Sequence, residues 1–457
     1  MTLLAINWSQ VGVQAGQLLL ALSILIVLHE FGHYITARWF KCRVEKFFLF
    51  FDPWFALVKK KVGDTVYGIG WLPLGGYVKI SGMIDESMDK EQMKQPPQPW
   101  EFRTKPAWQR LIIMLGGIIM NVLVAFIIYA FVLMIWGEKK TPISSVKSGI
   151  WTTDSLMINL GFKNGDNVIA INGDSVKYFE DIQTKVLIGG KDVLLKRNGK
   201  DTVLKLPIDL IDKLITRKDK RRTLLLERVP AYVGAYAKKD TSYGNRAGLK
   251  EFDKIVSIDS IPVEFYDEMV SILGNKKNGQ VEIAVERNGQ LQKLISNVSA
   301  DGKIGIPLLS DSQYDSLGVF DVVTTKYGFF EAFPAGVKKS GEKLGFYIDQ
   351  FKLILNPETG AYKGVGGFKS IGSVFPTYWS WEAFWNITAF LSIILAFMNL
   401  LPIPGLDGGH VVFTLWEMVT GKKPGDKFME YAQIVGFVIL IALMLYANLN
   451  DFFGWGK

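Results

Sequence analysis

The sequence predicts a polytopic α-helical membrane protein with four membrane-spanning helices, a membrane-associated β-hairpin or sheet, and two tandem α+β modules. Three observations support this fold class. The 457 residues are 49% hydrophobic with a mean hydropathy of +0.19, between the values of soluble and wholly membrane-embedded proteins. Long apolar runs lie near both ends of the chain. The polar stretch between them contains an internal repeat.

The first apolar run predicts a membrane helix over residues 13–36, and it contains the motif H-E-F-G-H at residues 29–33. Because His29 and His33 are four residues apart, they lie one helical turn apart on the same face. This spacing lets two imidazoles hold one Zn²⁺ while Glu30 acts as a general base. Such patterns also occur by chance on solvated helices, but a charged group inside a bilayer costs about 2.5–3.5 kcal/mol. The motif therefore predicts a buried metal site.

Basic residues follow this helix directly, at Arg38, Lys41, Arg43 and Lys46. By the positive-inside pattern they place this end in the cytoplasm and the N-terminus outside. The formal charge of +8 fits the same pattern, because basic residues cluster beside apolar segments, so we expect no nucleic-acid partner. The single cysteine, Cys42, excludes an internal disulfide and a thiolate metal site. Residues 1–10 carry no positive charge, so we expect no cleavable signal peptide.

Residues 37–109 are expected to form a hairpin or re-entrant region and a proline-containing linker on the cytoplasmic side. Turn signals separate short strand-like runs at residues 46–51, 54–60, 65–69 and 77–80. The apolar stretch 70–79 is too short to span a membrane, and it is tolerated at membrane depth only beside a protein cavity. Its edge could pair with an extended substrate backbone. An ordinary interfacial hairpin explains it equally well.

The second membrane helix is expected over residues 110–136, where Gly116, Gly117 and Asn121 interrupt the apolar face. Small residues allow two helices to approach closely, and an amide in lipid seeks a hydrogen-bond partner. We interpret Asn121 first as a helix-packing residue and second as part of a site.

The polar stretch that follows contains the repeat. The sequence G-F-K-N-G-D-N-V-I-A-I-N at residues 161–172 matches G-L-K-E-F-D-K-I-V-S-I-D at residues 248–259, and each copy is followed by a strand ending in Arg-Asn-Gly. The pattern is similar to PDZ domains, which bind extended peptides by strand addition at a sheet edge. We assign these PDZ-like modules to residues 137–220 and 221–310. One of the two copies could be a structural spacer only.

Residues 311–380 carry an amphipathic helical pattern at 341–355, followed by a glycine-rich loop at 364–371. A helix of this length cannot cross a bilayer, so we expect it to lie on the outer membrane surface. The loop lacks the strand–turn–helix context of a phosphate-binding loop.

The third membrane segment is expected over residues 381–410 and the fourth over residues 428–449, joined by a short turn flanked by lysines. The lysines place this turn in the cytoplasm, so Asp407 reaches the same side and depth as the histidine pair. A catalytic zinc usually takes three protein ligands, and Asp407 is the best candidate for the third. His410 is a rival, and both remain possible. Asn399 could donate to an oxyanion or to a neighbouring helix.

The ordered combination of H-E-F-G-H, P-L-G-G-Y-V-K, two PDZ-like repeats and N-L-L-P-I-P-G-L-D-G-G resembles the site-2 protease family of intramembrane zinc metalloproteases. The resemblance covers almost the whole chain and is greatest to the bacterial branch that regulates sigma-E. It implies one Zn²⁺ per chain held by His29, His33 and Asp407, with Glu30 as general base and Asn399 supporting catalysis. It also implies that the hairpin and the PDZ-like modules control substrate entry. The predicted substrate-binding residues are Gly75, Gly76, Tyr77, Val78, Lys79 and Asn121.

The same resemblance implies a zinc metalloendopeptidase of the bacterial inner membrane, with PDZ-like modules on the periplasmic side and the active site toward the cytoplasmic leaflet. Its substrates would be single-span proteins such as anti-sigma factors and remnant signal peptides, cut second in regulated intramembrane proteolysis. The PDZ-like modules would bind peptide C-termini or extended segments. Two rivals are a membrane-anchored scaffold without proteolysis, disfavoured by the intact motif, and a metal transporter, disfavoured by the few other polar groups in the membrane segments.

Overall fold

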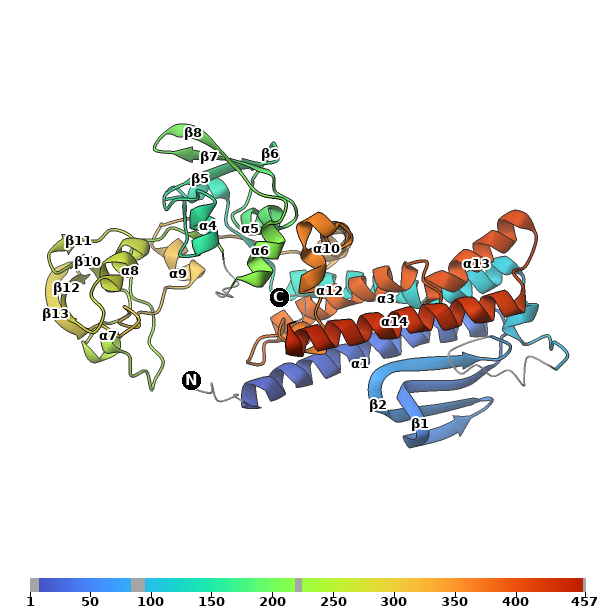
Figure 1. Ribbon diagram of the computed structural model, residues 1–457. Coiled ribbons are helices and arrows are strands. Elements are labelled where there is room, and N and C mark those ends of the chain that lie inside the picture. Colours follow the sequence, from blue (N-terminus) through green and yellow to red (C-terminus); the bar gives the residue numbers. More distant parts are fainter. Residues whose placement is uncertain (1–7, 84–94, 218–223, 455–457) are drawn as a thin grey trace. The chain divides into compact units, whose positions relative to one another are not determined.

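The computed structural model describes residues 8–83, 95–217 and 224–454, and the chain forms two compact units (Figure 1). The helical unit comprises Met1–Gly137, Lys326–Lys352 and Gly364–Lys457. The sheet unit comprises Glu138–Thr325 and Leu353–Lys363.

Among the residues that the structure describes, four helices of the helical unit are long and apolar enough to cross a membrane, as the apolar runs predicted. Local signals mark where they begin. Pro106, which has no backbone N–H to leave unpaired, precedes one of them, and the Ser380 hydroxyl caps another by accepting the Ala383 N–H at 3.3 Å. The four helices are α1 (Trp8–Trp39), α3 (Ala107–Ile135), α12 (Trp381–Leu400) and α14 (Asp426–Phe453).

A further helix, α13 (Asp407–Thr420), begins within the segment predicted as the third membrane helix, residues 381–410, and continues where the sequence predicted only a short turn. The sequence did not predict this separate helix, because the prolines and glycines around its start look like turn residues, whereas Val411 and Thr414 bury one face of a regular helix. The helix ends at Gly421, whose φ of 68° is left-handed. At 14 residues it is too short to span a bilayer.

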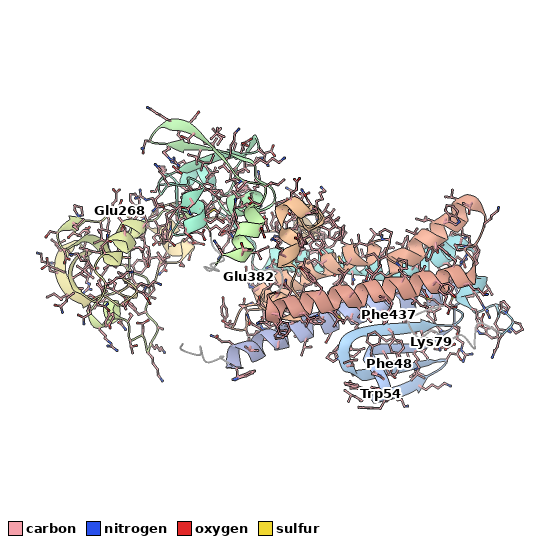
Figure 2. All side chains as sticks on the ribbon, in the orientation of Figure 1. Phe48, Trp54, Lys79, Glu268, Glu382 and Phe437 are labelled. Carbon is pink, nitrogen blue, oxygen red and sulfur yellow. The ribbon has the colours of Figure 1, made fainter. Side chains whose placement is uncertain are left out.

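Helix α3 lies at the centre of the helical unit, since α1, α12 and α13 all pack against it. Two glycines allow the closest approach. A Cβ on Gly32 of α1 would lie 2.2 Å from the Gly116 carbonyl oxygen, and a Cβ on Gly116 would lie 2.6 Å from that of Gly32. A larger residue at either position would push the helices apart. Helix α14 instead leaves many apolar side chains exposed, including Phe437 (Figure 2), as expected for a lipid-facing helix.

Two long strands, β1 (Val44–Val62) and β2 (Thr65–Ile80), form an antiparallel sheet beside α1 (Figure 1). The first part of β1 pairs with both ends of β2, because β1 and β2 each bend back on themselves. Lys46, for example, lies opposite both Val66 and Lys79. The second half of β2 therefore forms an edge of the sheet. The four predicted strand-like runs lie within these two strands.

The sheet unit contains two four-stranded antiparallel sheets, ordered β6-β5-β7-β8 and β11-β10-β12-β13. Each copy of the sequence repeat contributes one sheet and one helix. The first copy forms β5 (Asn167–Ile171), β6 (Asp174–Ser175), α5 (Glu180–Leu187), β7 (Asp192–Arg197) and β8 (Lys200–Lys205). The second forms β10 (Lys254–Ile258), β11 (Ile261–Pro262), α8 (Tyr266–Gly274), β12 (Gln280–Arg287) and β13 (Gln290–Asn297).

A buried ion pair explains residues that the two copies share. Arg197 donates two hydrogen bonds of 2.7 Å to Asp166 and one of 2.6 Å to the carbonyl oxygen of the glycine that opens the repeat. Arg287 does the same for Asp253, at 2.7 and 2.6 Å, and for the equivalent glycine at 2.7 Å. Both aspartates are buried. The shared aspartate and arginine therefore stabilise each sheet.

The hydrophobic core of the first sheet extends beyond residues 137–220. Strand β4 (Ile150–Trp151) pairs with β9 (Leu226–Glu227), and the same core includes Leu309 and Phe320. Segments on both sides of the second sheet in the sequence thus complete the core of the first. The module boundaries at 220 and 310 stay a prediction.

The predicted amphipathic segment 341–355 forms the second half of α10 (Phe329–Leu355). The glycine-rich loop leads into α11 (Phe368–Gly372), and its Gly367 N–H donates to Asp451 of α14 at 2.9 Å, so the loop binds a carboxylate of this chain. The remaining elements are β3 (Glu138–Lys140), α4 (Ser155–Asn159), α6 (Leu210–Thr216), α7 (Tyr243–Arg246), α9 (Asp311–Ser316), β14 (Val323–Thr325) and short 3₁₀ turns.

Candidate metal centre

Three side chains with metal-binding atoms converge from α1 and α13. His29 and His33 lie one turn apart on α1, and Asp407 is the first residue of α13. The two histidine Nε2 atoms are 3.3 Å apart, and they lie 3.2 and 3.3 Å from Asp407 Oδ2. The structure thus brings together the three residues that the sequence nominated as metal ligands.

The backbone around Asp407 explains how this carboxylate reaches the histidines. Helix α12 ends before the Leu-Pro-Ile-Pro segment, which turns the chain before α13 begins. A Cβ on Gly408 would lie 2.2 Å from the Leu401 carbonyl oxygen, and a Cβ on Gly409 would lie 2.7 Å from the Pro404 Cα. Both glycines are therefore needed for the start of α13 to fold onto the turn.

The hydrogen bonds around these residues fit a site that holds a cation. His33 Nδ1 lies 2.8 Å from the backbone oxygen of Ile113, which can only accept, so in the neutral ring the proton is on Nδ1 and Nε2 presents a lone pair. Asp407 Oδ2 is buried, and among the residues that the structure describes it has no hydrogen-bond partner other than the two imidazoles. In a tetrahedral zinc site with bonds of 2.0–2.1 Å, ligand atoms are about 3.3 Å apart. The observed spacing of 3.2–3.3 Å matches this geometry.

Two more polar side chains border the metal-binding atoms. Glu30 is close enough to all three ligand residues for their charges to act on it, and the Val78 backbone in β2 offers it a hydrogen bond. Asn399 Nδ2 lies 3.3 Å from His29 Nε2. The nominated proton acceptor and the nominated amide donor are therefore both at the cluster.

The edge segment of β2 passes directly beside Glu30. A Cβ on Gly76 would lie 2.6 Å from Ile26 Cγ2 and 3.5 Å from Glu30 Cγ. Since only glycine leaves room there, Gly76 is what lets the strand approach α1 so closely.

The side chains of two nominated substrate-binding residues are held by the sheet itself. The Tyr77 hydroxyl donates to Asp52 at 2.7 Å, and Lys79 forms an ion pair with Glu45 at 3.4 Å. Figure 2 shows Lys79 on the sheet. The backbone of this segment pairs with β1 on one side and faces α1 on the other. A role in substrate binding for these positions would therefore fall to the backbone.

Helix α3 contributes two residues to the cluster. A Cβ on Gly117 would lie 2.4 Å from His33 Nε2 and 2.5 Å from His29 Cε1. Asn121 is fully buried, and its Nδ2 lies 3.1 Å from His29 Nδ1. Sequence reasoning treated Gly117 only as a packing residue. The adjacent glycines in an apolar helix were a signal of close approach, but the sequence could not tell that imidazoles fill the space.

His410, the rival third ligand, lies outside the metal-binding cluster. Its Nε2 is 2.9 Å from Gln433 Nε2 of α14. It lines a separate cleft together with the Arg110–Glu417 ion pair. The structure therefore favours Asp407 over His410 at the third position.

The fold and the cluster define a membrane protein with a metal centre built on an H-E-x-x-H helix. Comparison with known proteins names the family. The model of peptidase family M50 matches residues 17–443, so the chain belongs to this family of zinc metalloproteases, the site-2 proteases. The metal that the family implies is therefore zinc.

Relatives from several bacteria match along nearly their whole length. Proteins named "Putative zinc metalloprotease" are 28% identical in Vibrio cholerae, over 95% of this chain and 97% of the relative, and 30% identical in Rickettsia conorii, over 95% and 96%. The chain is also similar to the regulator of sigma E protease of Haemophilus influenzae, at 26% identity over 96% of this chain and 98% of that protein.

Proposed function

We propose that this chain is an intramembrane zinc metalloprotease that hydrolyses peptide bonds within the transmembrane segments of single-span proteins. The observation that carries the proposal is the convergence of His29, His33 and Asp407 beside Glu30, on a helix apolar enough to cross a membrane. A carboxylate next to a zinc site can act as the general base when water hydrolyses a peptide bond. Asn399 lies at the same cluster.

Each residue of the cluster has a separate role in the proposed hydrolysis. Zinc, when bound, supplies a Lewis acid that activates water for attack on a carbonyl. Glu30 takes the proton of the attacking water and delivers it to the leaving amine. Asn399 Nδ2 donates a hydrogen bond to the oxyanion that develops on the scissile carbonyl. His29, His33 and Asp407 hold the metal.

The edge of β2 supports a route for presenting the substrate. A transmembrane helix shields its own carbonyls by hydrogen bonding, so it must unwind before water can attack. The backbone at residues 75–79 pairs with β1 on one side only and runs past Glu30, so an unwound segment can add to it as a further strand. Such pairing would replace the hydrogen bonds that the substrate loses on unwinding.

The substrate class follows from the family and from the sheet unit. The relative named regulator of sigma E protease supports membrane-anchored anti-sigma factors as substrates, together with remnant signal peptides. The two repeated sheets act as PDZ-like modules that bind peptide C-termini or extended segments and exclude substrates with large external domains. This exclusion makes the reaction the second cut in regulated intramembrane proteolysis.

The basic flanks of the apolar helices support a multi-pass location in the bacterial inner membrane. Lysines and arginines follow α1 and precede α14, which assigns those ends to the cytoplasm. The metal-binding residues then lie toward the cytoplasmic leaflet, and the PDZ-like modules lie on the periplasmic side.

The test is cleavage of a single-span substrate by the full-length protein in lipid vesicles, with a Glu30→Gln variant as control. We expect cuts within the membrane segment that a zinc chelator abolishes and added zinc restores. The Glu30→Gln variant should bind one zinc and cut nothing. An active, folded Glu30→Gln variant would remove Glu30 from the mechanism, and a zinc-loaded wild type that binds substrates without cutting would identify a scaffold.

A further inference from the structure

The side-chain amide of Asn121 in α3 has a polar contact at its nitrogen but none at its oxygen among the described residues. Its Nδ2 lies 3.1 Å from His29 Nδ1, whereas its Oδ1 is buried with no hydrogen-bond partner among the described residues. Its backbone oxygen accepts the Ser392 hydroxyl of α12 at 2.7 Å, which fixes the backbone on the helix interface. A buried amide oxygen without a donor lowers the stability of the fold, so it calls for an explanation.

The neighbouring imidazole supplies one. His29 Nε2 faces the cluster, 3.2 Å from Asp407 Oδ2, so it is the atom that would hold zinc. An Nε2 that holds a metal carries a lone pair, and the ring proton is then on Nδ1, where it needs an acceptor. Rotating the Asn121 amide by half a turn brings Oδ1 to this N–H and gives the idle oxygen its donor. The two ends of a carboxamide have the same shape, so the rotation needs no extra space.

We propose that Asn121 is a positioning residue for His29. Its amide rotates so that the atom facing His29 Nδ1 matches the tautomer of the ring. With zinc held, Asn121 Oδ1 accepts the Nδ1–H. Without zinc, the ring proton is on Nε2 and is donated to Asp407, while Asn121 Nδ2 donates to Nδ1. The inference rests on the proposed zinc site and adds to it a residue that orients one ligand in both states.

The other histidine shows why an amide is needed at this position. Behind His33 stands the Ile113 carbonyl oxygen, which only accepts, so the neutral ring keeps its proton on Nδ1 with or without a metal. An amide both accepts and donates, and therefore fits both tautomers of His29. The Ile113 carbonyl group thus fixes the tautomer of His33, whereas the Asn121 side chain can accommodate either tautomer of His29.

Nitrogen NMR of the full-length protein in detergent, with ring-labelled histidine, tests this asymmetry directly, because the chain has only three histidines. Adding zinc should move the His29 proton from Nε2 to Nδ1 and leave the His33 proton on Nδ1. An Asn121→Asp variant, which only accepts, should hold His29 in the Nδ1–H form even before zinc is added. A wild-type His29 that has its proton on Nδ1 in both states would overturn the proposal.

Zinc affinity, measured by competition with a chelator, gives the second readout. Asn121→Leu should weaken binding by about 10–100-fold, as loss of a hydrogen bond behind a ligand does, while Asn121→Asp should keep wild-type affinity. Ser392→Ala, which removes the neighbouring hydrogen bond without touching the amide, is the matched control and should bind as wild type. Wild-type affinity in folded Asn121→Leu, or equal weakening in Ser392→Ala, would contradict the proposal.

These readouts do not depend on proteolysis. A wild type that binds one zinc with the expected histidine tautomers but cuts nothing would remove the proposed protease and leave the role of Asn121 standing. If the wild type cuts its substrate and Asn121→Leu binds zinc as tightly as the wild type does, the proposed protease would stand and the role of Asn121 would be removed.

Discussion

The metal-binding cluster of the helical unit and the Asp–Arg pairs of the sheet unit both bury carboxylates, but they satisfy them differently. Asp166 accepts two hydrogen bonds from Arg197 and one of 2.8 Å from the Lys163 N–H, so its countercharge is part of the chain. Asp407 Oδ2 faces the two imidazole nitrogens and has no other hydrogen-bond donor among the described residues. A buried carboxylate with its own cationic partner is structural, whereas one whose neighbours are two metal-binding imidazoles indicates a site for a cation.

The largest effect is expected from removing a ligand of the metal-binding cluster. Asp407→Asn should reduce zinc binding below detection, because the amide oxygen is a weak ligand and the negative charge is lost. The stability of the metal-free protein should not fall, since no countercharge in the chain is left unpaired. Zinc content after dialysis and denaturant unfolding of the metal-free protein measure the two parts. Retention of zinc by this variant would show that Asp407 is not a ligand.

An aspartate-to-asparagine change in the first repeated sheet should lower stability and leave zinc binding unchanged, the opposite of the result expected for Asp407→Asn. Asp166→Asn leaves the half-buried Arg197 without its countercharge and should destabilise the sheet unit by about 3 kcal/mol, with unchanged zinc binding. The exposed pair of Lys293 and Glu282 supplies the control, and Glu282→Gln should change stability little. Equal effects of the two variants would mean that the buried pair does not stabilise the sheet.

Glu227 of β9 represents a third case, a half-buried carboxyl whose near charges are of the same sign. Burial raises its pKa to about 7, and Asp311 and Glu180 add to the shift. Because the folded pKa exceeds the unfolded value of 4.5, the protonated form stabilises the fold below about pH 4.5, and this stability is lost as the pH rises to about 7. Glu227→Gln should therefore be more stable than wild type at about pH 8, by about 2 kcal/mol after allowance for partial exposure.

Unfolding free energies of both proteins across this pH range provide the measurement. The difference between Glu227→Gln and wild type should shrink toward about pH 5, where the wild-type carboxyl is protonated in the folded state. A constant difference across the range would show that Glu227 titrates normally.

The smallest expected effect concerns the space behind the imidazoles. Gly117→Ala adds a Cβ 2.4 Å from His33 Nε2, so the rings must shift and zinc affinity should fall by about tenfold, or 1.4 kcal/mol. Gly12→Ala on α1 is the control, because a Cβ at Gly12 meets no atom within 4 Å. If both variants bind zinc as wild type does, the cluster tolerates displacement of its ligands and the packing argument fails.

The features that the sequence predicted well are those with a local pattern. Helix α1 with its histidine pair, the four apolar helices and the repeated sheets all follow from spacing, hydropathy or self-similarity over a few tens of residues. The approach of Asp407 to the histidines was also predictable, because flanking charge fixes the side of the membrane on which each helix end lies.

The features that the sequence did not predict depend on contacts between distant segments. Nothing local distinguishes Gly117, which clears space for imidazoles, from Gly116, which packs against a helix backbone. The sequence did not predict α13 as a separate helix, because the prolines and glycines around its start are typical of turns. The core of the first sheet includes Leu309, far along the chain from the strands it covers. Asn121 was assigned to substrate binding, and only the structure puts its amide against His29.

The most direct test of the zinc site is the X-ray absorption spectrum of the zinc-loaded full-length protein in detergent. Two imidazole nitrogens from His29 and His33 and a carboxylate oxygen from Asp407, at bond lengths of about 2.0–2.2 Å, should account for the protein ligands. A spectrum with three imidazoles, which would require His410, or with a sulfur ligand would contradict the site described here.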